Sequence, residues 1–220
     1  MNVVKYDSNK FRKIVSTTLS NYANMIKRLE KRKKISEFVL IYYSIFLIMT
    51  TLTGKYFPET YNLVLSEYFN IIISVIVLIY SLINKNANYS SRLDVLLSSL
   101  NALKTIKRMV DDNNVNKYND QYNKIVDNTE RRDDVDFFIT VKQLCKEHNI
   151  NWITKKSKKI NIDNIPNEEA EEQNRQQKVV NKYISEINVF VQEGKIILSV
   201  IWDIIIIAIP VLLFVICMCL

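Results

Sequence analysis

The sequence predicts an all-α integral membrane protein with an N-terminal transmembrane helical hairpin, a cytosolic helical region and a C-terminal transmembrane helix. The 220 residues include only two Gly and three Pro, although folds built from strands and turns need both. Apolar residues gather in three blocks separated by polar sequence, which is the pattern of membrane spans. The net charge of +7 equals the basic excess of residues 1–37, which directly precede the first block.

Residues 1–37 are predicted to form a basic amphipathic helix in the cytosol. Apolar side chains recur at spacings of three and four: Phe11, Ile14, Val15, Leu19, Tyr22, Ile26 and Leu29. The Lys and Arg run at 27–34 favours contact with anionic lipid and a cytosolic location. Direct nucleic-acid binding is not expected, because no recognition motif or aromatic platform accompanies the charge.

Residues 38–83 are predicted to form the transmembrane hairpin, with spans at about 38–53 and 63–83. The first span has about 16 residues, fewer than the roughly 20 that usually cross a bilayer. Gly54 and Pro58 mark the short turn between the spans. This turn carries one Lys and one Glu while both flanks are basic, so we expect the turn to lie outside.

Residues 84–150 are predicted to form cytosolic helices, the first over 85–110. Aspartate and asparagine at 111–116 end it; a short helix follows, and a third begins near residue 134. The first helix carries a heptad-like apolar seam that predicts self-association through Leu93, Leu96, Leu100 and Leu103. Packing of this seam within the chain, against the helix at 135–145, is the alternative.

Residues 151–167 are predicted to be a polar linker, and residues 168–220 a long helix that ends in a span at about 196–220. We expect that helix to run without a break into the membrane, to bend at Gly194 and to kink at Pro210. With the middle of the chain in the cytosol, the third span runs outward. The C-terminus is therefore expected outside.

No catalytic, cofactor-binding or metal-ligating residue is expected. Two glycines cannot build a phosphate-binding loop, and the single histidine, His148, has no nucleophile or carboxylate at motif spacing. The acidic group of Asp133, Asp134 and Asp136 falls at a predicted helix start, where solvated carboxylates suit the helix dipole.

Polar residues inside the spans are the candidate functional residues. On the second span they are Glu67, Asn70, Ser74 and Ser81; on the first, Ser44 and Thr51 follow Glu37 at intervals of seven; on the third there is Asp203. Such stripes either form helix–helix interfaces or line a pore, and both interpretations stay open. Asp203, some 10 Å into its span, is expected to pair with another span or to reach back to the cytosolic surface.

Several features together resemble the SLATT domains, the two-span effector domains associated with bacterial nucleotide-signalling modules. They are the basic helix, the two spans with a very short turn, and the exit helix through 84–93. The segment at 129–138, TERRDDVDFF, is similar to the fifth subfamily, found beside reverse transcriptases. The resemblance covers about residues 10–150, and the third span is expected to depart from the family's two-span core.

The resemblance implies a membrane effector of a prokaryotic antiviral defence system, located in the inner (plasma) membrane. In that role a sensor partner encoded nearby (a reverse transcriptase, nucleotidyltransferase or nucleotide sensor) detects infection. The effector then forms a homo-oligomer and opens a pore or disrupts the lipid bilayer. The alternative is a non-conducting membrane scaffold that docks a cytosolic partner through its helices.

Overall fold

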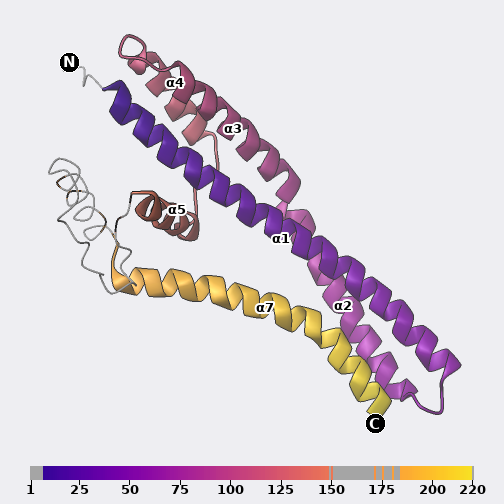
Figure 1. Ribbon diagram of the computed structural model, residues 1–220. Helices are drawn as coiled ribbons and strands as arrows, with labels where there is room; N and C mark the ends of the chain where they lie inside the picture. Colours follow the sequence, from indigo (N-terminus) through magenta and orange to yellow (C-terminus); the bar gives the residue numbers. More distant parts are fainter. Residues whose placement is uncertain are drawn as a thin grey trace. The chain divides into compact units, whose positions relative to one another are not determined.

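The computed structural model describes residues 7–148, 150, 171, 175, 180 and 184–219 (Figure 1). Helices and short connections account for these residues, none of which lies in a strand, so the predicted all-α class is confirmed. Three helical stretches are long and apolar enough to cross a membrane, as predicted. The helices are α1 (Ser8–Tyr56), α2 (Leu63–Ala87), α3 (Tyr89–Met109), α4 (Val115–Asp127), α5 (Asp134–Glu147) and α7 (Glu186–Cys219).

Helix α1 joins the basic segment and the first span in one helix of 49 residues, so residue 37 marks a change of composition and not a break. The expected linker at 151–167 and the expected helix start at 168 lie outside the described residues. The expectation of an unbroken helix into the third span is wrong, because Ile184 and Ser185 are not helical. Ser185 Oγ instead accepts a hydrogen bond from the Asn188 amide at 3.2 Å, which helps to begin α7.

The helix predicted over 85–110 is also divided, at Asn88. This residue has φ 44° and ψ 44°, a left-handed conformation that Asn tolerates better than most residues. Asn88 ends α2, and its carbonyl then accepts the Arg92 amide at 3.1 Å as α3 begins. Gly194, the expected bend, lies inside α7 without a break.

The described residues fall into two compact units. Unit 1 comprises Met1–Ile26 and Val95–Ile197, and unit 2 comprises Lys27–Asp94 and Leu198–Leu220. In unit 1 the start of α1 packs against α4, where the rings of Phe11 and Tyr122 meet edge to face at 5.7 Å.

The seam of α3 faces the interior of the chain. Leu96 and Leu103 are completely buried, and Leu93 and Leu100 are each only 8% exposed. Beside them, the hydroxyls of Ser99 and Thr129 hydrogen-bond at 2.9 Å. Packing within the chain therefore accounts for the burial of these leucines, whereas their expected partner, the helix at 135–145, stays a prediction. Self-association of the protein stays a prediction and needs other side chains.

Helix α5 is fixed to α1 by buried polar contacts. Asn24 Nδ2 donates to Thr140 Oγ1 at 2.9 Å, and Thr140 donates to the carbonyl of Asp136 at 3.0 Å. Asp136 is completely buried, and its Oδ2 accepts the backbone amide of Asp133 at 3.2 Å. The expectation that this carboxylate is solvated is therefore wrong, because it is used to begin the helix.

A second core in unit 1 joins α5 to the start of α7. Cys145, Ile184 and Val189 are buried there, and burial raises the pKa of the Cys145 thiol. At the edge of this core, Lys142 Nζ and Glu193 Oε1 form an ion pair at 2.8 Å.

Candidate functional site in the membrane helices

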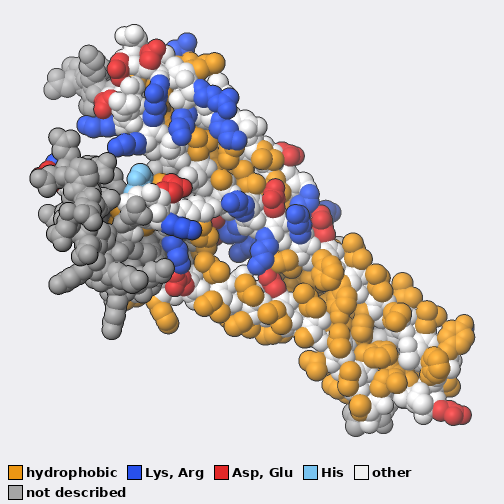
Figure 2. All heavy atoms as spheres, viewed as in Figure 1, with side chains coloured by type: hydrophobic (Ala, Val, Ile, Leu, Met, Phe, Trp, Pro, Cys, Tyr) orange, Lys and Arg blue, Asp and Glu red, His pale blue; other side chains and the backbone are white. Residues whose placement is uncertain are grey.

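Unit 2 holds the membrane segments, and its surface is apolar. Most large side chains of the spans are exposed; Ile41, Ile48 and Ile71 are each more than 60% exposed. Figure 2 shows hydrophobic side chains covering the visible face of these helices. The core between the helices is small and contains Val39, Tyr43, Ile73 and Ile206. An apolar outside with a narrow core is what a bilayer requires of helices within it.

A proline in α7 leaves one backbone carbonyl of this helix without its helical donor, and a side chain of α1 supplies a donor instead. Pro210 lacks an amide hydrogen, so the carbonyl of Ile206, four residues earlier, loses its helical donor. The Tyr43 hydroxyl donates to this carbonyl at 2.7 Å. The neighbouring Tyr42 hydroxyl donates to the Ile207 carbonyl at 3.2 Å. The expected kink site is thus also the place where α7 is joined to the hairpin.

The far end of α7 is held by the turn of the hairpin. The Asn62 amide donates to the carbonyl of Cys217 at 3.0 Å, and the Asn62 side chain accepts the amide of Leu65 at 3.1 Å. Asn62 therefore begins α2 and also satisfies a carbonyl of the last turn of α7.

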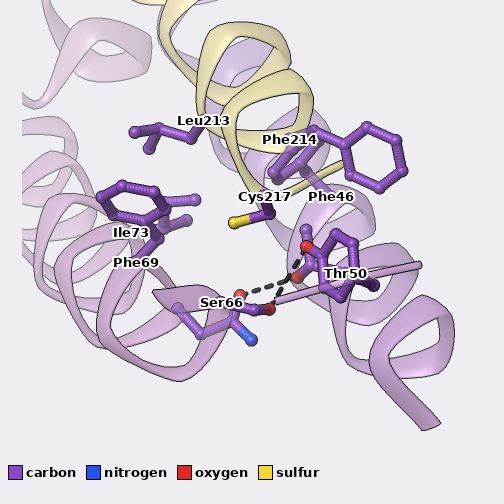
Figure 3. Close-up of a pocket in the computed structure, with 10 residues that line it drawn as sticks. Phe46, Thr50, Ser66, Phe69, Ile73, Leu213, Phe214 and Cys217 are labelled. Atoms are coloured by element: carbon purple, nitrogen blue, oxygen red, sulfur yellow. Dashed lines mark hydrogen bonds between the residues drawn. The ribbon is translucent and has the colours of Figure 1, made fainter. Parts of the chain in front are cut away.

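A polar cluster lies between the three helices at this end (Figure 3). The Thr50 hydroxyl donates to Asn70 Oδ1 at 2.6 Å, and the Ser66 hydroxyl donates to the Tyr61 oxygen at 3.2 Å. The space between these side chains, closed by Phe214 and its neighbours, has no room for a water molecule. The three helices are therefore closely packed around this cluster.

Asp203 forms an ion pair with Lys31, with Nζ and Oδ2 3.4 Å apart. It lies three residues before Ile206, the partner of Tyr43, and therefore about 5 Å toward the basic end of the bundle. The first span begins at Phe38, a similar distance before Tyr43. Asp203 thus lies near the edge of the hairpin, and its partner belongs to the basic segment and not to a span.

The predicted stripe on the first span lies beside the buried face. The interior side chains recur at Ser36, Tyr43 and Thr50, one residue before the predicted series. Glu37, Ser44 and Thr51 are exposed. The hydroxyls of Ser44 and Thr51 donate to carbonyls four residues earlier, at 2.7 and 2.8 Å. These hydroxyls are satisfied within their own helix and hold no other part of the chain.

The predicted polar residues of α2 do not all face the same way. Asn70 turns inward to Thr50, whereas Glu67, Ser74 and Ser81 are exposed. The Ser74 hydroxyl donates to the carbonyl of Asn70 at 2.8 Å. The structure therefore brings Asn70 alone of the seven candidate residues into the packed interior of the hairpin.

The exposed residues of both stripes share one side of the hairpin. On each helix the exposed polar residues come one position after the buried ones, which is a rotation of 100° around the helix axis. Because α1 and α2 run antiparallel with their buried faces toward each other, these two rotations bring the polar residues to the same side of the pair. The Thr50–Asn70 hydrogen bond sets the register of the pair. Three levels result, matched to within about 3 Å along the axis: Glu37 with Ser81, Ser44 with Ser74, and Thr51 with Glu67.

Sequence reasoning missed the side chains that hold the helices together: Tyr42, Tyr43, Thr50, Tyr61, Asn62 and Ser66. The proline gave a signal for a contact such as that of Tyr43. A proline leaves the carbonyl four residues earlier without its helical amide donor, so a donor from another helix is expected there. The period of seven on the first span is present, and the side chains that pack inside this bundle precede the predicted polar series by one residue.

The described residues contain no group of three or more side chains that could hold a metal ion. The fold and the polar features define a helical integral membrane protein. The model of the SMODS and SLOG-associating 2TM effector domain family 5 matches residues 5–216, and the chain belongs to this family, as the resemblance predicted. The match includes most of α7, so the third span is not an addition beyond the region that the family shares. No curated protein and no solved structure matches the chain.

Proposed function

We propose that this membrane effector acts by assembling several copies around the polar side of its hairpin, which then encloses an ion-conducting path. The observation that carries the proposal is the set of six exposed polar side chains at three matched levels: Glu37, Ser44, Thr51, Glu67, Ser74 and Ser81. Glu67 carries a carboxylate, which is costly against lipid, so this side of the hairpin is expected to meet water or protein. The hydroxyls of Ser44, Thr51 and Ser74 donate within their own helices and keep acceptor lone pairs for water on the same side. The chain itself does not cover them.

The close packing inside unit 2 favours a path formed by several copies over a path through one chain. The space among Thr50, Asn70 and their neighbours is too small for water, which supports a path that forms between copies. Glu37 and Glu67 stand at opposite ends of the proposed lining. Rings of carboxylates at both mouths would favour cations.

We place this activity in the inner membrane of a prokaryote, with the N-terminus and unit 1 in the cytosol and the C-terminus outside. A cytosolic sensor partner encoded nearby, such as a reverse transcriptase, nucleotidyltransferase or nucleotide sensor, triggers assembly during infection. The family's effector role and the basic segment before the first span support this arrangement.

The first experiment compares ion flux from the wild type and the Ser44→Leu/Ser74→Leu double variant. A membrane-potential dye is read in cells that also carry the native neighbouring genes. We expect the double variant to lower the flux about tenfold or more, because an apolar wall promotes dewetting. In purified membranes the Glu67→Lys variant should reduce or reverse cation preference.

The matched control is a pair of isosteric changes on one helix. Thr51 belongs to the polar side, whereas Thr53 lies on the opposite flank, and both hydroxyls donate to carbonyls four residues earlier. Thr51→Val should lower the flux and Thr53→Val should not. Absence of wild-type depolarisation under every triggering condition would instead favour the non-conducting scaffold.

A further inference from the structure

Unit 1 contains a cavity that the membrane activity does not use. It lies between α5 and the first turns of α7, with a volume of about 210 Å³. Liquid water occupies about 30 Å³ per molecule, so the cavity has room for several waters or a compact polar group. Phe138, Val189 and Ile196 give it an apolar wall.

The polar side chains that line this cavity include both basic and acidic groups and a buried amide. Lys142 and Lys146, one helical turn apart on α5, bring two positive charges, and Glu193 is paired with the first of them at 2.8 Å. Gln192 is only 7% exposed, and its Oε1 has no hydrogen-bond partner. A buried acceptor without a donor is costly, so this oxygen indicates a ligand that brings one.

A neighbouring face of the same helix segment is exposed and apolar. Ile187, Phe190 and Ile197 are 75%, 79% and 60% exposed, at spacings that place them on one stripe. Ile196, on the cavity wall, also begins the apolar run of the third span. The cavity therefore lies beside the part of α7 that directly precedes the third span, next to a surface suited to acyl chains.

We propose that this cavity binds the headgroup of an anionic phospholipid whose headgroup also carries hydroxyl donors, as phosphatidylglycerol does. The phosphate is bound by Lys142 and Lys146, and the glycerol hydroxyls donate to Gln192 Oε1 and Glu193. The acyl chains extend from the cavity past Ile197, where the exposed stripe enters the third span. This proposal is independent of whether the hairpin conducts ions.

The test is native mass spectrometry of the full chain in a neutral detergent with added lipid. We expect phosphatidylglycerol to be retained at least about fivefold better than phosphatidylcholine. The Lys142→Ala/Lys146→Ala variant should lose most of that preference. The matched control, Lys104→Ala/Lys107→Ala, removes the same charge from exposed positions of α3 and should keep it. Equal behaviour of the two double variants overturns the proposal.

Gln192→Leu separates headgroup recognition from general attraction to charge. Phosphatidic acid has the phosphate but lacks the headgroup glycerol, so this substitution should weaken phosphatidylglycerol severalfold and leave phosphatidic acid unchanged. An equal loss for both lipids contradicts the assigned role of Gln192. Glycerol 1-phosphate alone should not displace the lipid at matched concentration. If it does, the ligand of the cavity is a soluble organophosphate and not a lipid, which overturns the proposal. Circular dichroism of each variant checks that the helices are retained.

Discussion

The two units use their polar and apolar side chains in opposite ways. Unit 1 buries the leucines of α3 and pairs its interior polar groups side chain to side chain, as Asn24 does with Thr140. Unit 2 exposes most of its large apolar side chains, and only 11% of the most apolar window in the α2–α3 stretch is buried. Its hydroxyls mainly donate to backbone carbonyls, as Tyr43 and Ser44 do.

The difference follows from the solvent that each unit is built for. In water, apolar burial stabilises the fold, so a heptad seam becomes a core. In lipid there is little gain from burying leucine, and helices associate through close packing and hydrogen bonds. The same apolar periodicity therefore predicts the interior of unit 1 and the outer surface of unit 2.

The largest effect should come from the core of unit 1. Leu103→Ala removes a completely buried side chain and should destabilise the protein by about 2–5 kcal/mol. For a protein of this size that lowers the thermal midpoint by roughly 4–20 °C, read by circular dichroism in detergent. Leu97→Ala on the same helix is the control, since Leu97 is 42% exposed, and should change the midpoint little. Equal effects of both changes would contradict the burial of the seam.

A smaller loss is expected for Asn24→Leu. The substitution removes the donor to Thr140 Oγ1 and to Gln143 Oε1, at 2.9 and 3.2 Å, from a buried position. Leaving such acceptors unpaired costs about 1–3 kcal/mol. The matched control is Asn101→Leu, at an exposed position of α3. A midpoint unchanged from the wild type in Asn24→Leu would show that these contacts contribute nothing.

The helices could be predicted from the sequence because their signals are local and strong. Three apolar blocks gave the spans, and the polar run at 111–116 gave the end of α3. The break at Asn88 could not be predicted with similar security, because asparagine is also common inside polar helices and only its left-handed backbone reveals the junction. Which partner covers the α3 seam also depends on contacts distant in sequence, such as the Ser99–Thr129 pair.

The candidate site was harder to predict, because a shift of one residue along a helix decides whether a polar side chain faces the interior or the outside. A period of seven in polar residues fits both an interface and an outward stripe, and only packing places Thr50 inside and Thr51 outside. Asp203 shows the same limit. Its depth within α7 follows from the sequence, but its level in the bundle depends on how α7 is aligned with α1.

The contact between α7 and the hairpin gives the smallest expected effect. Tyr43→Phe leaves the Ile206 carbonyl without a donor, because Pro210 supplies none. Hydrogen bonds between membrane helices contribute on average about 0.6 kcal/mol and at most about 1.7 kcal/mol, so the loss in thermal midpoint should be small but measurable. Pro210→Ala restores a backbone amide to this carbonyl.

In the Pro210→Ala background, Tyr43→Phe should therefore cost almost nothing, and the double-mutant cycle reports the coupling of the two residues directly. Tyr42→Phe is the control. Its acceptor, the carbonyl of Ile207, has the amide of Val211 available four residues later, so its effect should be the same in both backgrounds. If Tyr43→Phe costs as much without the proline as with it, the hydroxyl does not act by satisfying the carbonyl that Pro210 leaves open. Ring packing against Ile206 would then be what joins α7 to the hairpin.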